Sequence, residues 1–300
     1  MIFFNGQTRV GIDLSDYKVR LIALTGTRKP SIRTFCEIDI PTGTINEGAI
    51  QKTEVVVQLL KTLARHCKGL HWHDRTVRVG IPEQQSFITT VSLDSNHKGD
   101  NIDQVLEVIP FKKEELYYDV HEHRTRQAMS IAAARKAFVD QYLQIFSAAN
   151  FHVVALYSEA EAMATALLDK TTSTTAGIII IDLGRARTTV IFCCKGLVYF
   201  TTSYPSVLTG DTLNQGNFLA VTQQAMAFYG QHYAQYATLQ QLVLCGSGAY
   251  QPNLATTTQT ACAITTVLGN PLQHIRSNHF TKKLNRPLTF TTAIGLVLYA

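Results

Sequence analysis

Two aspartates at the ends of apolar segments are the residues of this 300-residue chain best suited to chemistry. Asp182 follows four isoleucines and precedes Gly184, and Asp13 follows the similar segment Val10-Gly-Ile and precedes Ser15. A strand of branched residues that ends in aspartate puts a carboxylate at the carboxyl edge of a sheet, where α/β proteins usually bind ligands. A small residue two positions later lets backbone N–H groups approach phosphate oxygens, while the carboxylate holds a metal-bound water.

Each of these turns, taken alone, is also what an ordinary β-hairpin shows, because aspartate is common in turns. The two copies lie far apart in the chain and have the same order of strand, carboxylate and returning strand. The pair therefore favours a duplicated nucleotide-binding architecture in which each half supplies one phosphate-facing turn.

The composition describes a globular chain, 46% hydrophobic and 16% charged, that is long enough for two cores. The formal net charge of +5 is spread along the sequence, and its densest basic groups are Arg124-Thr-Arg126 and Lys282-Lys283. This pattern argues against a nucleic-acid partner. No apolar segment reaches the length of a bilayer span, and the first residues lack the features of a secretory signal. We therefore expect a cytoplasmic protein without direct membrane insertion.

The cysteines and histidines do not form a metal or catalytic pattern. The six cysteines are Cys36, Cys67, Cys193, Cys194, Cys245 and Cys262. They show no Cys-x-x-Cys spacing, and several lie in apolar segments, where reduced cysteine behaves as a small hydrophobic residue. The sequence offers no second pair of metal ligands to accompany His71 and His73, so a zinc site is disfavoured. His121 and His123 are typical of a solvated strand face. No Ser-His-Asp or Cys-His arrangement and no P-loop lysine motif can be assigned.

Hydrophobic periodicity predicts the elements that must position the two turns. Strands are predicted at residues 9–24, 31–41, 75–81, 83–93, 117–125, 128–133, 153–157, 177–200 and 242–245. Helices are predicted at residues 50–68, 101–108, 135–149, 159–168, 219–229 and 292–300. The polar segment at residues 171–175 is the clearest domain boundary.

Several segments carry a resemblance to a known family. They are Val105-Leu-Glu-Val-Ile-Pro110-Phe111-Lys-Lys-Glu-Glu-Leu116, Tyr118-Asp119, Ala132-Ala-Ala-Arg-Lys136, Tyr142-Leu-Gln-Ile-Phe146-Ser-Ala-Ala-Asn150 and Leu156-Tyr-Ser-Glu159-Ala-Glu161-Ala-Met-Ala164. The order of the elements resembles the actin-like ATPase superfamily. Within it, these segments are similar to the PilM family of type IV pilus assembly proteins, whose relatives include MshI, HofM and the cytoplasmic domain of GspL. The resemblance covers nearly the whole chain and is strongest from about residue 75 to 190.

The resemblance implies an α/β actin-like ATPase fold with two duplicated ribonuclease-H-like lobes. The first lobe is expected at residues 1–170, with an extra small α+β subdomain inserted at about 84–154. The second lobe is expected at residues 171–300, with a shortened lid subdomain at about 204–240.

By position, the resemblance also assigns nucleotide-binding residues to three turns. They are Asp13, Ser15 and Arg20 in the first phosphate turn, Asp182, Gly184 and Thr188 in the second, and Gly246 and Gly248 in a glycine-rich adenosine turn. Asp13 and Asp182 are expected to serve a metal only if Mg-ATP binds. No catalytic residue is assigned.

The first turn departs from the family pattern. Ser15 stands where the family has glycine, Asp16 where it has serine or threonine, and Arg20 where it has a phosphate-binding lysine. Asp16 would bring a negative charge toward the phosphates, and two like charges at ~4 Å repel by about 4 kcal/mol at an effective dielectric of ~20. Arg185 and Arg187 either neutralise phosphate or pair with the aspartates as a salt-bridged relic. These departures and the short lid favour a degenerate site over one that binds ATP and Mg.

The leading functional hypothesis is a scaffold. PilM-like proteins are cytoplasmic and bind the cytoplasmic amino-terminal tail of the inner-membrane protein PilN. The resemblance thus implies an adaptor held at the inner membrane through protein partners, together with the assembly platform and motor components. Ile109, Pro110 and Phe111 are candidate contacts for an extended peptide that adds to a strand edge. For each of the three, packing within the inserted subdomain is the alternative.

Two other functions of the superfamily stay open. An ATP-dependent small-molecule kinase or phosphatase would need an intact glycine turn, against which Ser15 and Asp16 argue. An FtsA-like filament former predicts a carboxyl-terminal basic amphipathic helix, whereas this sequence runs to Ala300 inside the expected closing helix. A homodimer is neither predicted nor excluded.

Overall fold

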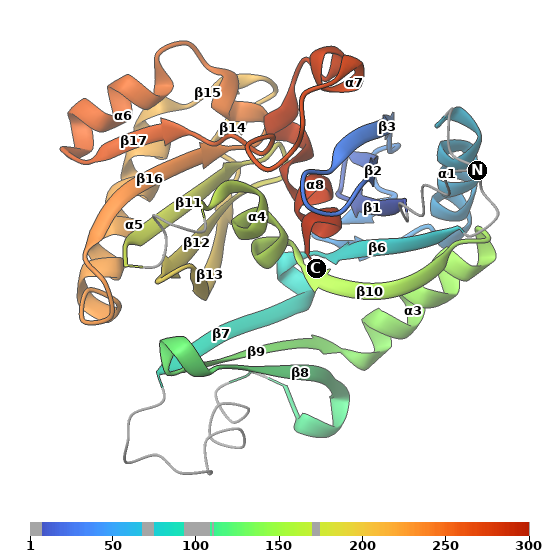
Figure 1. Ribbon diagram of the computed structural model, residues 1–300, viewed down its shortest axis with the longest axis horizontal. Helices are drawn as coiled ribbons and strands as arrows, with labels where there is room; N and C mark the ends of the chain where they lie inside the picture. The colour runs from blue at the N-terminus through green and yellow to red at the C-terminus, as the bar shows by residue number, and fades with distance from the viewer. Residues whose placement is uncertain (1–7, 68–74, 93–108, 110, 170–174, 300) are drawn as a thin grey trace. The chain divides into compact units, whose positions relative to one another are not determined.

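The computed structural model describes residues 8–67, 75–92, 109, 111–169 and 175–299 (Figure 1). The chain divides into two compact units, each assembled from separate stretches of sequence. The first comprises Met1–Pro82, Tyr142–Leu167 and Gly269–Ala300, and the second comprises Glu83–Gln141 and Leu168–Leu268. No helix in the described part of the chain is long and apolar enough to cross a membrane. The predicted helix at 101–108 and all but the last residue of the predicted linker at 171–175 lie outside the described residues.

The first unit is built on a five-stranded sheet with the order β10-β6-β1-β2-β3. Its strands are β1 (Arg9–Leu14), β2 (Lys18–Thr25), β3 (Ser31–Asp39), β6 (Thr76–Ile81) and β10 (His152–Ser158). β1, β2 and β3 form an antiparallel meander, while β6 runs parallel to both β1 and β10. Branched side chains such as Ile12, Leu21 and Ile22 are fully buried in this sheet, which matches the near-continuous apolar pattern of its strands.

Helices cover this sheet, and one of them accounts for a departure from the predicted lobes. The helices are α1 (Thr53–His66), α4 (Glu159–Leu167), α7 (His279–Lys283) and α8 (Thr291–Leu298). A Cβ at Gly11 of β1 would lie 2.6 Å from the Ala293 carbonyl oxygen, and one at Gly295 would collide with the Ala162 backbone. The Ala/Gly-rich α8 therefore packs closely on both β1 and α4. For this reason residues 269–300, predicted to belong to the second lobe, lie with the first unit.

The second unit repeats the same sheet plan, with the order β13-β12-β11-β16-β17. Its strands are β11 (Gly177–Leu183), β12 (Arg187–Cys194), β13 (Leu197–Pro205), β16 (Leu239–Cys245) and β17 (Thr265–Leu268). Three antiparallel strands are again followed by two parallel ones. The predicted duplication is confirmed.

The rest of the second lobe is small. The region of the predicted lid holds the hairpin of β14 (Leu208–Thr209) and β15 (Thr212–Leu213), followed by α5 (Gln215–His232). Asn214 caps α5 by accepting a hydrogen bond from the Asn217 N–H at 3.1 Å. α6 (Leu254–Cys262) lies between β16 and β17 in the sequence.

The inserted subdomain is an antiparallel sheet with the order β7-β9-β8. It comprises β7 (Ser86–Ser92), β8 (Leu116–His123) and β9 (Ala128–Arg135), and α3 (Lys136–Ala148) follows it. Its hydrophobic core consists of Ile109, Leu116, Met129, Ile131 and Ala133, with Phe87, Val91 and Val120 packed against them. The Thr90 hydroxyl donates to the Val198 carbonyl of β13 at 2.6 Å. This contact explains why the sheet, expected within the first lobe, groups with the second unit.

A disulfide joins Cys36 of β3 to Cys67, the residue that follows α1. The two Cα atoms lie 5.8 Å apart although the residues are 31 positions apart in the sequence. The sequence analysis did not predict this pair, because the return of α1 to β3 is a tertiary contact that cysteine spacing does not reveal. Cys193, Cys194 and Cys245 are buried free thiols, as expected.

Candidate functional site

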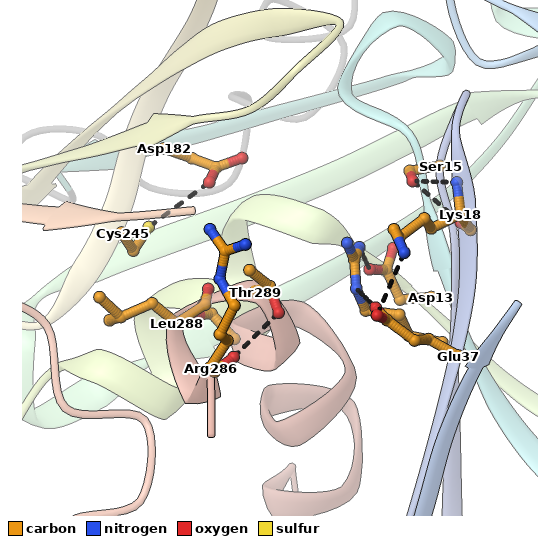
Figure 2. A network of polar contacts seen from close by, with 11 residues as sticks. Asp13, Ser15, Lys18, Glu37, Asp182, Cys245, Arg286, Leu288 and Thr289 are labelled. Carbon is orange, nitrogen blue, oxygen red and sulfur yellow. Dashed lines mark hydrogen bonds and ion pairs between the residues drawn. The ribbon is translucent and has the colours of Figure 1, made fainter. Parts of the chain in front are cut away.

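The first turn, between β1 and β2, is closed by its own hydrogen bonds (Figure 2). The N–H and the hydroxyl of Ser15 both donate to the Lys18 carbonyl, at 3.0 and 2.9 Å. The Ser15 hydroxyl in turn accepts from the Lys18 N–H at 3.3 Å. The polar groups that a phosphate turn would present at Ser15 are thus used inside the hairpin.

Asp16 has a structural partner in the next hairpin of the first unit. Its carboxylate accepts the N–H groups of Glu47 and Gly48, at 3.0 and 2.9 Å. These two residues connect β4 (Ile45–Asn46) to β5 (Ala49–Ile50) and both have positive φ, 52° and 73°. Such a two-residue loop needs left-handed backbone at both positions, which is unfavourable for Glu47. Asp16 therefore stabilises this turn.

Arg20 lies between two carboxylates. Its Nη1 is 3.5 Å from Oδ2 of Asp13, and its Nε is 3.2 Å from Oε2 of Glu37. The three residues are direct cross-strand neighbours on β1, β2 and β3, so strand register alone brings the charges together. The guanidinium also lies over the Phe290 ring, 5.8 Å from its centroid.

This ion pair is shielded from water. The side chain of Asp13 is 7% exposed and that of Arg20 13%. Burial raises the pKa of Asp13, and the charge and hydrogen bond of Arg20 oppose that rise. The cation beside the predicted metal-water carboxylate is therefore an arginine of the chain itself.

The second turn and the glycine-rich turn pack on each other in the second unit. A Cβ at Gly246, where φ is +83°, would collide with Oδ1 of Asp182 and lie 2.9 Å from the Leu183 backbone. A Cβ at Gly248 would lie 2.9 Å from that of Leu183. The thiol of Cys245 points at Oδ1 of Asp182, 3.8 Å away (Figure 2). Burial, and then the charge of Asp182, raises the pKa of this thiol. Both glycines are thus required by close backbone approach.

Other polar groups of the second turn are used in packing. Thr188 is fully buried, and its hydroxyl accepts the Val207 N–H at 3.3 Å. Ser206 donates to the Gly184 carbonyl at 2.9 Å, and Ser247 donates to the Leu183 carbonyl at 3.3 Å. Thr188, predicted to bind nucleotide, therefore ties the turn to the connection after β13.

Each unit assembles its own part of the predicted nucleotide site. The first unit holds Asp13, Ser15 and Arg20, and the second holds Asp182, Gly184, Thr188, Gly246 and Gly248. Sequence reasoning missed Glu37 and Ser206, which contact residues of these turns.

Arg187 has a partner within the second unit. The amide oxygen of Gln84 accepts a hydrogen bond from Nε of Arg187 at 3.0 Å once the amide is oriented to suit its neighbours. In the described ranges, no group of three or more His, Cys, Asp or Glu residues is arranged to hold a metal.

The three residues predicted to contact a partner are placed differently from one another. Ile109 is 4% exposed and belongs to the core of the inserted sheet, whereas Phe111 is 40% exposed. Pro110 lies outside the described residues. Tyr117 and Tyr118 of β8, which the prediction did not include, are 47% and 41% exposed. Exposed aromatic residues therefore lie both just before β8 and on it.

One serine–histidine contact bears on the enzyme alternative. Nε2 of His123 lies 2.9 Å from the Ser130 hydroxyl, which lies 2.7 Å from that of Thr90. Thr90 must give its proton to the Val198 carbonyl, so Ser130 donates to Thr90 and accepts from His123. An imidazole that donates to serine cannot also take its proton. The pair is therefore not an activated nucleophile.

The fold is that of the actin-like ATPases. The solved structure of a PilM–PilN type IV pilus biogenesis complex superposes with a TM-score of 0.72 at 14% identity, covering 97% of this chain and 97% of that chain. The ethanolamine utilization protein EutJ from Carboxydothermus hydrogenoformans has a TM-score of 0.57 at 13% identity, over 98% of this chain and 90% of that one. A protein with an actin-like ATPase fold from Bacteroides thetaiotaomicron has a TM-score of 0.54 at 12% identity, over 95% and 98%.

The family is established by sequence. The profile of the type IV pilus assembly protein PilM family matches residues 11–217, well over half of the chain. No curated protein matches the sequence. The chain belongs to the PilM family of type IV pilus assembly proteins, and the predicted resemblance is confirmed.

Proposed function

We propose that this protein is an actin-fold scaffold of a type IV pilus assembly platform. In this proposal it lies in the cytoplasm, binds the cytoplasmic amino-terminal tail of a PilN-like inner-membrane protein, and acts without Mg-ATP in its ancestral nucleotide site. Family membership supports the pilus role. The likeness to a PilM solved together with PilN supports the choice of partner.

The ion pair of Asp13 and Arg20 is the observation that carries the nucleotide-free part of the proposal. A carboxylate that is to serve a magnesium ion needs room for the ion and its water ligands. Here it has an arginine at 3.5 Å, and Ser15 and Asp16 are engaged with Lys18 and with the β4–β5 turn. The residues of the first turn therefore do not fit a magnesium–phosphate group.

The second turn keeps ATP binding as a second candidate property. Gly246 and Gly248 retain the close backbone approach to Asp182 and Leu183 that a nucleotide-binding turn requires. A site with only this half intact would bind an adenine nucleotide weakly, because the metal and the terminal phosphates would lack partners at the first turn.

The peptide-binding part rests on β8 and the segment before it. β8 is an edge strand of the inserted sheet, and among the described strands only β9 pairs with it. Phe111, just before the strand, and Tyr117 and Tyr118, on its two opposite faces, are exposed aromatic residues. An extended tail can add main-chain hydrogen bonds to such an edge and place alternate apolar side chains on the aromatic rings.

The test is calorimetric titration with a synthetic peptide of the amino-terminal tail of a PilN-like inner-membrane protein. Phe111→Asp is expected to weaken binding by about tenfold or more, the cost of a lost aromatic anchor of more than about 1.4 kcal/mol. Leu268→Asp is the matched control, because Leu268 is an exposed apolar residue, 47% accessible, on the edge strand β17. Unchanged affinity in the Phe111 variant removes this segment from the groove, and no binding by the parent chain contradicts the adaptor role.

A further inference from the structure

The second unit brings the turns of two hairpins together. Arg126, in the turn between β8 and β9, donates through Nη1 to the Gly196 carbonyl, 3.5 Å away in the turn between β12 and β13. Thr90, one strand further along the inserted sheet, bonds to Val198 at the start of β13. We call residues 121–127 and 195–196 the cationic tip. Its described charged and titratable groups are His121, Glu122, His123, Arg124, Arg126 and Lys195.

Among the described residues of this tip, positive charge exceeds negative charge. Three permanent cations share one carboxylate, that of Glu122, whose Oε2 lies 3.6 Å from Nε of Arg124. The side chains of this pair are 54% and 86% exposed, so water screens the attraction and leaves the charges largely independent. The rings of His121 and His123 lie 4.5 Å apart, and protonation of His123 adds to the excess.

The titration of His123 fits a crowded cationic surface. Burial lowers its pKa, and the charges of His121 and Arg126 lower it further. A bound anion would act in the opposite direction and raise this pKa. Anion binding at the tip should therefore take up protons and strengthen as the pH falls toward the range where histidine titrates.

We propose that the cationic tip docks an extended acidic segment of a protein partner. β8 has a free edge within the described sheet, and His121 and His123 are alternate residues on one face, about 7 Å apart along the strand. A strand added along this edge would place carboxylates of alternate residues opposite the two imidazoles. Arg124 and Arg126 follow directly and can bind carboxylate in a bidentate manner.

A protein segment fits this surface better than a lipid bilayer. Peripheral membrane binding combines cations with apolar side chains that enter the interface. The large exposed apolar residues of the described chain lie elsewhere, the nearest in sequence being Tyr117 and Tyr118 at the other end of β8. The cationic tip lies at the end of β8 away from Phe111, but a strand that runs along the whole of β8 would occupy the edge proposed for a PilN-like tail, so the two segments should exclude each other.

The experiment uses the full chain and a fluorescein-labelled peptide of alternating Glu and Thr, eight residues long to match β8, followed by anisotropy at low ionic strength. The expected result is binding about tenfold tighter than that of the same peptide with Gln for Glu, and tighter at about pH 6 than at about pH 8. Arg124→Gln with Lys195→Asn should weaken binding by about fivefold or more. Asn is chosen because Lys195 has a φ of 52°.

Two control variants keep the result interpretable. Lys282→Gln with Lys283→Gln removes two exposed cations from α7 in the first unit and should leave affinity unchanged. His121→Gln with His123→Gln should abolish the pH dependence, while a glutamine amide can still donate to Ser130. The proposal is overturned if the Gln peptide binds as well, or if the tip variant binds like the parent chain. It is also overturned if phosphatidylglycerol vesicles, rather than the peptide, bind in a manner that requires Arg124 and Lys195.

Discussion

The replacement Arg20→Met removes the cation that pairs with the buried carboxylate of Asp13, and its cost should depend on pH. At 3.5 Å the attraction between Asp13 and Arg20 is about 5 kcal/mol at an effective dielectric of ~20. Breaking a buried pair by deleting one partner usually costs about 3–5 kcal/mol, because the remaining charge stays buried. The contact that Arg20 makes with Glu37 is lost as well, but it is partly exposed and adds little. We therefore expect a loss of about 3 kcal/mol in unfolding free energy near neutral pH.

The sign of the pH dependence follows from the raised pKa of Asp13. Between its unfolded value, near 3.8, and its higher folded value, the native state holds a proton that the unfolded state has released. Stability therefore falls as the pH rises through this window, by at most about 1.4 kcal/mol per pH unit. Loss of Arg20 raises the folded pKa further and extends the window upward. The cost of Arg20→Met should thus be small in acid and grow with pH.

The assay is urea denaturation followed by circular dichroism at several pH values from about 5 to about 8. Asp13→Asn combined with Arg20→Met should remove the added pH dependence, because the titrating group is gone. Arg33→Met is the matched control on β3, where Arg33 donates to Thr8 at 3.2 Å, and should cost less than about 1 kcal/mol. A cost below about 1 kcal/mol for Arg20→Met, or one that does not change with pH, would refute the claim that Arg20 neutralises Asp13.

Three further predictions test other parts of the structure. Reduction of the Cys36–Cys67 disulfide, or Cys67→Ser, should lower unfolding free energy by up to about 4 kcal/mol, because the bridge spans 31 positions; an unchanged urea midpoint would contradict this. Gly246→Ala should destabilise the fold by more than about 2 kcal/mol in thermal unfolding, because the added Cβ would collide with Asp182. Gly210→Ala is the control: Gly210 also has a positive φ but has open space around it, so the change should cost about 1 kcal/mol. Equal costs for the two variants would contradict the packing argument. Asp182→Asn should retain the PilN-like tail in a pull-down, and loss of the tail by a folded variant would sink the nucleotide-free proposal.

The duplicated sheets could be predicted because their signals are local. An apolar strand that ends in aspartate and is followed by a second strand can be recognised within about fifteen residues. The hairpins β1–β2 and β11–β12 both form as expected. The helices α1, α3 and α4 also follow from periodicity within single segments.

The polar contacts of the first turn could not be predicted, because they depend on strand register and on contacts between segments that are distant in the sequence. Asp13, Arg20 and Glu37 meet only when three strands pair at one particular offset. Asp16 was expected to face phosphate, but its partners lie 31 and 32 positions away in a turn that periodicity does not place. The sequence gives the charges of these residues but does not show which residues they pair with in the fold.

The partner-binding segment shows the same limit at the level of single side chains. Ile109 and Phe111 are both apolar and only two positions apart, yet one is in the core and the other is exposed. Their different environments arise from the path of the chain before β8, which has no regular period from which burial could be inferred.

The most direct test of a scaffold without a working nucleotide site is thermal unfolding with and without millimolar Mg-ATP. The ion pair at Asp13 and the closed turn at Ser15 predict no change in the unfolding midpoint. A site of micromolar affinity would instead stabilise the fold by about 4 kcal/mol at a thousandfold excess of ligand, and would raise the midpoint by several degrees. Such a shift would contradict the account, because it would require Arg20 and Ser15 to serve a bound phosphate.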